Sequence, residues 1–167
     1  MTAWQDISRS TSQRVQALDA WWHAKAGSRP LPDRADLDPA EISQLLPYVL
    51  ISELIRPFRV RYRLLGTEVV QIAGMDFAGC YLDELIPAGD EEAWMDHYRL
   101  CAQTARPVYG VSTVKTLSGS AFSYEYGIWP LTKGSAEVSQ FIGIEDYGPH
   151  KIRARALLDQ VKQWRRA

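Results

Sequence analysis

Apolar residues follow a helical period near the start of the chain. Val15, Leu18 and Trp22 recur at helical spacing and share one face. The hydroxyl residues at 10–12 are suitable helix N-caps, and Gly27 marks the end of the pattern. We therefore expect an N-terminal helix whose single apolar stripe must be buried, either on its own domain or on a second copy of the chain.

Strand-forming residues dominate five later segments. In the second of them, Val60, Tyr62 and Leu64 alternate with arginines, which is typical of a strand with one covered face. Consecutive strands joined by short turns favour antiparallel over parallel pairing. The five predicted strands are 48–54, 59–65, 108–117, 121–131 and 140–145.

Helical segments fill much of the remaining chain. Asp38 and Pro39 are suited to start a short helix that ends at Pro47, and Gly74 interrupts short helical pieces between the second and third strands. Asp90 is suited to cap a longer helix that ends before Pro107. This order predicts an α+β fold, in which a five-stranded antiparallel sheet has short helices on one face and flanking helices at both termini.

Composition and charge narrow the class of protein. The 167 residues, 46% of them hydrophobic and 23% charged, suit one globular domain. A net charge of −1 gives no strong field, so neither nucleic acid nor anionic lipid is an expected partner. Cys80 and Cys101 lie outside any CxxC pair, which favours reduced thiols over a metal site. With no signal-peptide pattern and no stretch long enough to span a membrane, we expect a cytoplasmic protein.

Two spaced motifs make the chain similar to a known family. The first is the segment 31–39 followed by Leu45-Leu46-Pro47, and the second is 61–67 followed by Gly74 and Gly79. Together they resemble PAS domains, and in particular a bacterial subfamily of stand-alone PAS domains. The resemblance implies a PAS-like domain flanked by two helices, and a cavity between the sheet and the short helices that holds a small molecule. The implied units are an N-terminal flanking helix over 1–29, the PAS-like domain over 30–147 and a basic C-terminal helix over 148–167.

Tyrosines and apolar residues on the strands and the long helix are the candidate lining of that cavity, although they equally suit an ordinary core. The expected ligand-binding residues are Tyr62, Leu64, Trp94, Tyr98, Cys101, Tyr124, Tyr126 and Ile142. The sequence identifies no cofactor. The cysteine segment of photoactive flavin domains is absent, and His97 beside an apolar helix face fits a structural histidine better than a haem ligand.

The N-terminal helix is the expected homodimer surface. Its residues Val15, Leu18, Trp21 and Trp22 are assigned to that interface. A ligand in the cavity would shift the packing of the flanking helices, and a separate signalling protein would receive the change, because the chain encodes no output domain.

The chain is therefore interpreted as a non-catalytic sensory or interaction module, and two alternatives remain. One is a small cone-shaped α+β enzyme with His97 beside Tyr98 as its base. Such an enzyme should have a polar cluster at the cavity floor, whereas a sensor should have an apolar cavity. The other is an adaptor that acts through the segment 151–167, which has six basic residues against Asp159 alone.

Overall fold

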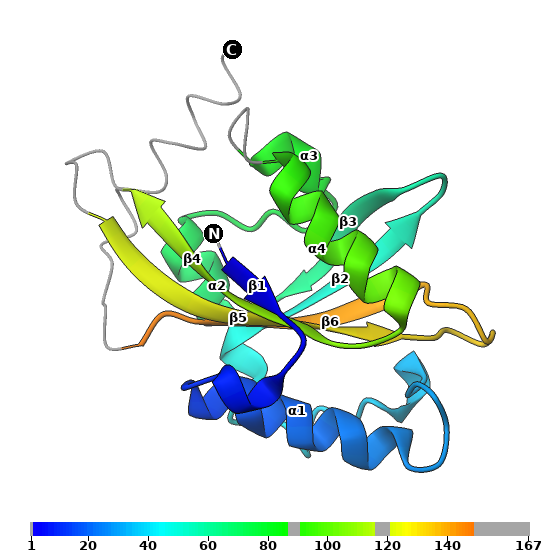
Figure 1. The fold of residues 1–167 in the computed structure, drawn as a ribbon. Helices are drawn as coiled ribbons and strands as arrows, with labels where there is room; N and C mark the ends of the chain where they lie inside the picture. The colour runs from blue at the N-terminus through cyan, green and yellow to red at the C-terminus, as the bar shows by residue number, and fades with distance from the viewer. Residues whose placement is uncertain (1, 87–90, 116–120, 149–167) are drawn as a thin grey trace.

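A six-stranded antiparallel sheet forms the centre of the molecule, with helices on both faces (Figure 1). The computed structural model describes residues 2–86, 91–115 and 121–148. The strands are β1 (Thr2–Trp4), β2 (Val49–Ile55), β3 (Arg59–Leu65), β4 (Val108–Lys115), β5 (Ala121–Leu131) and β6 (Gln140–Asp146), in the spatial order β1-β4-β5-β6-β2-β3. All five neighbouring pairs are antiparallel.

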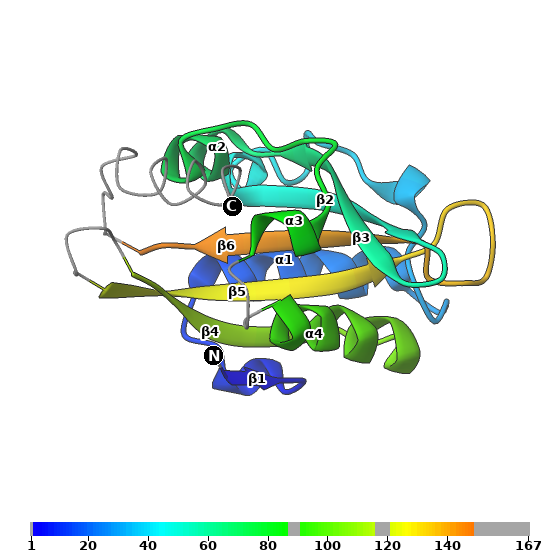
Figure 2. The ribbon, with the colours of Figure 1, turned by 90° about the horizontal axis from the view of Figure 1, so that it is seen from above.

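Within the described ranges, four α-helices cover the two faces of the sheet. They are α1 (Gln13–Ala26), α2 (Thr67–Ala73), α3 (Leu82–Leu85) and α4 (Glu91–Thr104). Helices α2, α3 and α4 lie on one face, called the inner face here, and α1 lies on the opposite, outer face (Figures 1 and 2). The predicted α+β fold and its five strands are confirmed. Residues 149–167 of the predicted basic C-terminal helix lie outside the described residues.

Helix α1 begins and ends where its sequence predicts. Ser12 is the N-cap, and its hydroxyl accepts a hydrogen bond from the Val15 amide at 3.1 Å. Gly27 follows the helix with φ of 57°, a conformation that favours glycine.

The predicted dimer surface is wrong for three of its four residues. Val15 and Leu18 are completely buried and Trp22 is 4% exposed, because they pack against the outer face of the chain's own sheet. That face is itself apolar, with Trp129 and Ile144 buried beneath the helix. An apolar sheet face must be shielded from water, and α1 provides this. Trp21 remains partly exposed and donates a hydrogen bond to Glu41.

Polar contacts fasten both ends of the α1 segment to the sheet. At its start, the Glu125 carboxylate on β5 accepts hydrogen bonds from Ser10, Thr11 and Ser12. Arg14 pairs with Asp146 on β6 at 2.6 Å.

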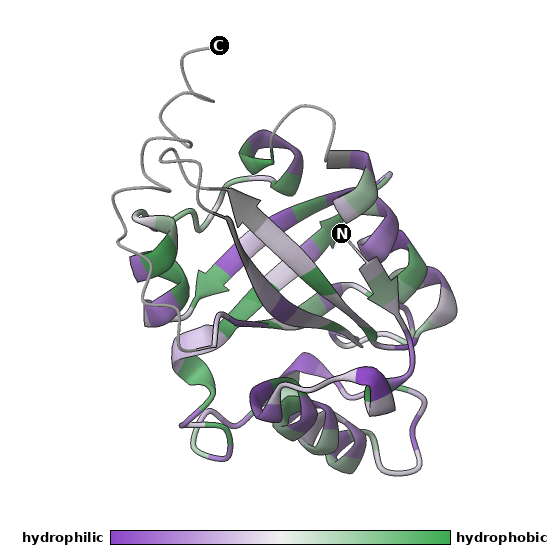
Figure 3. Ribbon diagram, turned by 60° about the vertical axis from the view of Figure 1, so that its left-hand side comes forward, coloured by the Kyte–Doolittle hydropathy of each residue, from purple (hydrophilic) through white to green (hydrophobic). Residues whose placement is uncertain are grey.

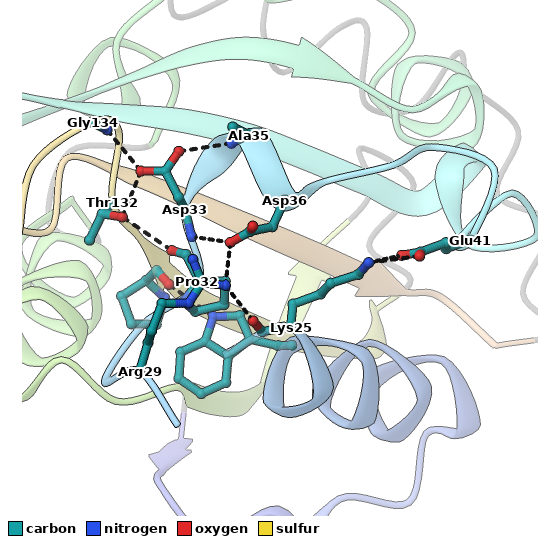
Figure 4. Close-up of polar contacts among 11 residues, drawn as sticks. Lys25, Arg29, Pro32, Asp33, Ala35, Asp36, Glu41, Thr132 and Gly134 are labelled. Atoms are coloured by element: carbon teal, nitrogen blue, oxygen red, sulfur yellow. Dashed lines mark hydrogen bonds and ion pairs between the residues drawn. The ribbon is translucent and has the colours of Figure 1, made fainter. Parts of the chain in front are cut away.

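Beyond the end of α1, Asp33 holds the end of β5 (Figure 4). Its carboxylate accepts from the Thr132 hydroxyl and the Gly134 amide, both at 2.8 Å. Arg29 and Asp36 pair beside it at 2.7 Å. The outer face is therefore closed by a segment that is anchored at both ends.

The chain before β2 differs from the prediction. The segment expected to be a helix from Asp38 forms consecutive turns and a short 3-10 helix over Leu46–Tyr48. The Asp38 side chain accepts from the amide of Ala40 rather than starting an α-helix. The stretch is short, and Pro47 lacks the amide that a longer helix would need, so tertiary contacts decide its shape.

Gly66 joins β3 to α2 where two backbone segments approach each other closely. It is the N-cap of α2, and its φ of −66° is open to any residue. A Cβ at Gly66 would overlap the carbonyl oxygens of Leu46 and Pro47. Glycine is required here because of this contact, not because of its backbone angles.

We expect Gly66→Ala to lower the free energy of unfolding by about 2 kcal/mol, because the new methyl group forces two backbone segments apart. Urea unfolding measures the change. Gly143→Ala is the matched control, since its Cβ would meet nothing closer than the Gly127 carbonyl oxygen at 3.4 Å. Equal losses for the two variants would contradict the close-contact explanation.

Candidate ligand site between the sheet and helices α2–α4

The inner face of the sheet and helices α2–α4 enclose one large hydrophobic cluster. Apolar residues from β2, β3, β5 and β6 meet residues from all three helices there. Figure 3 shows the hydropathy of these elements, with both hydrophobic and hydrophilic stretches on the strands and on the helices around them. The buried members are Leu50, Val60, Tyr62, Val69, Ile72, Leu82, Met95, Tyr98, Cys101, Val108, Tyr124, Tyr126, Ile128, Phe141 and Tyr147.

Six of the eight predicted ligand-binding residues come together in this cluster. Tyr62 extends from β3, Tyr98 and Cys101 from α4, and Tyr124 and Tyr126 from β5. Trp94, also on α4, is partly buried and packs against them.

Leu64 and Ile142 are placed elsewhere, so their assignment to the site is wrong. A register shift between Ile51 and Ser52 lets Arg63 interrupt the alternation of β3, so that Leu65 and not Leu64 continues the inner face. Leu64 is 45% exposed. Ile142 points to the outer face and packs with α1, because β6 is apolar on both faces.

Glu145 is the one carboxylate that the described strands place on the inner face, and the sequence pattern did not predict it. Glu145 lies directly across from Tyr126 in the β5–β6 register. It accepts a hydrogen bond from the hydroxyl of Tyr147, two residues further along. In a strand, Phe141 and Glu145 share one face, so the two-residue period from Phe141 could have identified Glu145. However, Ile142 and Ile144 make the opposite face equally apolar, so the sequence does not show which face is the inner one.

The aromatic rings around Glu145 form a connected wall. Ring centroids lie 4.7 Å apart for Trp94 and Tyr126, 6.3 Å for Tyr126 and Tyr124, and 5.1 Å for Tyr124 and Tyr147. Tyr126 is also hydrogen-bonded to Nδ1 of His97 at 2.7 Å. The wall therefore runs from α4, across β5, to the end of β6.

Burial controls the charge of this site. Burial raises the pKa of Glu145 from its ordinary value of 4.5 to about 7, against the opposing effect of the Tyr147 hydrogen bond. The side chain is deeply set among its neighbours but remains partly exposed to solvent. Burial also raises the pKa of Tyr62, Tyr124 and Tyr147, which keeps the phenols neutral. It lowers the pKa of His97, so that the imidazole is neutral at physiological pH.

The raised pKa of Glu145 predicts a distinct dependence of stability on pH. Above pH 4.5 the unfolded chain releases the proton of Glu145, while the fold retains it up to a pH of about 7. Stability therefore falls as the pH rises through this interval, by up to about 3 kcal/mol. Glu145→Gln removes the loss, so we expect this variant to match the natural protein near pH 4 and to be more stable near pH 8.

Urea unfolding at a series of pH values measures this difference. Glu137→Gln, which neutralises an exposed carboxylate, is the control. If the difference between the Glu145→Gln variant and the natural protein does not change with pH, the carboxyl does not titrate as described.

The described residues contain no group of three or more histidine, cysteine, aspartate or glutamate side chains arranged to hold a metal ion. Cys101 is buried, and its thiol donates to the Ile128 carbonyl at 3.6 Å. No helix in the described part of the chain is long and apolar enough to cross a membrane. A separate open cleft of about 550 Å³ lies on the outer side, with Trp22 and Tyr109 among its lining residues.

Solved structures with light-oxygen-voltage domains resemble this chain at low sequence identity. An RNA-binding light-oxygen-voltage receptor is 14% identical with a TM-score of 0.52; the match covers 79% of this chain and 39% of the receptor. A light-oxygen-voltage domain studied with a flavin analogue is 14% identical (TM-score 0.49, coverage 74% and 93%). The light-oxygen-voltage protein of Rhodobacter sphaeroides is 10% identical (TM-score 0.48, coverage 78% and 93%).

The family comparison covers most of the chain. No curated protein matches the sequence. The family model described as "PAS domain" matches residues 10–145, which include the four helices α1–α4, strands β2 to β5, most of β6 and Glu145 itself. The chain belongs to the PAS domain family.

Proposed function

We propose that this chain is a non-catalytic sensory module that binds a small molecule beside Glu145 and passes its state to a separate protein. PAS domains are generally sensory rather than catalytic. The proposal places the ligand between the inner face of the sheet and helices α2–α4. Tyr62, Trp94, Tyr98, Cys101, Tyr124 and Tyr126 keep their assignment as ligand-binding residues in this proposal.

One observation supports the proposal most: a carboxyl group and several phenols gather inside a cluster that is mostly apolar, with Ser52 and Ser112 as the other buried polar side chains beside it. A buried polar group costs free energy unless its hydrogen bonds are satisfied. Phenylalanine would fill much the same volume as Tyr124 or Tyr147 without placing a hydroxyl in the cluster. Groups of this kind at this position therefore favour a binding role over a purely structural one.

An enzyme is the second candidate, because the polar cluster is the feature expected of a catalytic cavity floor. The polarity of the site alone would favour it. However, His97 is hydrogen-bonded to Tyr126 rather than to Tyr98. In addition, the chain has the PAS fold rather than a cone-shaped enzyme fold. Family membership is what favours the sensor.

The signal would pass through β5 and β6, because the ligand site and the anchors of α1 occupy opposite faces of the same strands. The cross-strand pair Tyr126–Glu145 faces the proposed ligand, and the adjacent pair Glu125–Asp146 holds the start of α1. A ligand that binds one arrangement of these strands more tightly would shift the population of α1 positions by its difference in affinity.

Native mass spectrometry of the protein purified from its own host tests the proposal. We expect a small non-covalent mass that is lost on denaturation, and that is reduced in a Tyr124→Phe, Glu145→Gln double variant. Tyr109→Phe is the control, since Tyr109 is equally buried but lies on the outer face. Two results would contradict the proposal. One is a retained mass that the double variant does not reduce. The other is the absence of any retained mass together with no thermal shift when host small-molecule extract is added. The same spectra report whether the predicted homodimer forms.

A further inference from the structure

The charge balance of the inner face indicates the class of ligand, if the proposed function is correct. Glu145 is the carboxyl group of this face, and among the described residues only Tyr147 is hydrogen-bonded to it. The arginines on nearby elements pair elsewhere: Arg61 with Glu53, and Arg99 with Asp96 and Glu92. His97, the remaining nitrogen base of the site, is held neutral by its burial. An ionised Glu145 thus has no cationic partner among the side chains that the structure describes.

The surroundings of Glu145 supply aromatic faces rather than further charges. The three ring pairs of the wall are tilted by 46°, 53° and 39°, so none of them is stacked face to face. The faces of Trp and Tyr rings carry negative potential and attract cations that lie within about 6 Å of the ring centre. Burial, and after it the Glu145 charge, raises the pKa of four phenols, those of Tyr62, Tyr98, Tyr124 and Tyr147. The inner-face cluster therefore combines one carboxyl group with several aromatic rings.

We propose that the site takes a small organic cation of the alkylammonium type, with Glu145 as counter-ion and the rings of Trp94, Tyr124, Tyr126 and Tyr147 as its walls. Such a cation has a diffuse charge and apolar substituents, so it loses less hydration than a compact ion when it enters an aromatic site. A metal ion would need several oxygen ligands, and the site offers one carboxylate. An anion would meet the Glu145 charge without a described cation to balance it.

The partial exposure of Glu145 gives the ligand access to its counter-ion. Because a bound cation favours the ionised carboxyl, binding is coupled to release of the Glu145 proton. The affinity should then rise with pH through the interval in which Glu145 ionises. A neutral ligand would show no such coupling.

Choline is a suitable probe, and its neutral analogue, in which a tert-butyl group replaces the trimethylammonium group, is a control of the same shape. We expect calorimetric titration to show binding of choline, and binding of the neutral analogue about tenfold weaker or less. Between pH 5.5 and pH 8 the choline affinity of the natural protein should rise by about tenfold or more, following the ionised fraction of Glu145. Equal affinity for both probes, or no binding of choline, would overturn the proposal.

Variants separate the charge from the rings. We expect Glu145→Gln to lower choline affinity by about tenfold and to abolish its pH dependence, while the exposed-site control Glu137→Gln changes neither. Tyr124→Leu, which removes the aromatic face, should bind choline several-fold more weakly than Tyr124→Phe, which keeps it. The pH series on the natural protein tests the proposal even if a variant fails to fold. A neutral or anionic compound found in the native mass spectra would refute this inference while leaving the proposed sensory function intact.

Discussion

Replacing Trp22 with alanine is expected to lower the free energy of unfolding by about 4 kcal/mol. The indole is 4% exposed on the outer face of the sheet, and its N–H donates to the Pro130 carbonyl at 2.9 Å. The substitution therefore leaves a cavity under α1 and an unpaired carbonyl group. Chemical unfolding of the purified protein measures the loss.

Trp21→Ala is the matched control for this variant. The two tryptophans are neighbours on α1, but Trp21 is partly exposed and its indole N–H contacts only Glu41. We expect it to cost about 1 kcal/mol. If Trp22→Ala left stability unchanged but dissociated a dimer, α1 would serve an interface between copies rather than the core of its own chain.

Asp19→Ala is expected to lower the free energy of unfolding by about 3 kcal/mol. Asp19 is 6% exposed, and its carboxylate accepts from the Tyr109 hydroxyl and, at 2.9 Å, from the Trp129 indole. Removing it leaves two donors buried beneath α1 without an acceptor. The unfolding free energy, measured at constant pH, reports the effect.

A double-mutant cycle checks the cause of this loss. In the Tyr109→Phe background one of the two donors is already absent, so Asp19→Ala should cost less there, by about 1 kcal/mol. Additive effects of the two substitutions would show that the buried hydrogen bonds do not account for the loss.

Local patterns in the sequence predicted most of the elements. The two-residue period of 121–131 puts Tyr124 and Tyr126 on one face and Trp129 on the other, and the structure has them so. The caps of α1 at Ser12 and Gly27 are likewise set by residues next to the helix. These features depend on near neighbours along the chain, which is why a single sequence contains them.

The features that the sequence did not reveal depend on contacts between distant segments. Strand β1 has three residues, too few to show alternation, and exists because it pairs with β4. The register shift opposite Arg63 turns Leu64 away from the core, and nothing local marks it.

The most consequential ambiguity was which residues of β6 face the inner side of the sheet. With Phe141 on one face and Ile142 and Ile144 on the other, either face could be the inner one. Because Ile142 was assigned to the site, Glu145 was not predicted to face the ligand. The apolar outer face that α1 covers was not predicted either. A strand that is buried on both sides lacks the polar face from which its orientation could be inferred.

Tyrosine-selective NMR during titration with host small-molecule extract tests most directly whether the inner face is the ligand site. The chain has eight tyrosines. Some lie in the inner-face cluster, whereas Tyr109 lines the outer cleft and Tyr48 lies outside the inner cluster. We expect the signals of Tyr62, Tyr98, Tyr124 and Tyr147 to shift, and those of Tyr109 and Tyr48 to remain in place. Shifts confined to Tyr109 or Tyr48, or no shift in any tyrosine, would contradict a ligand site around Glu145.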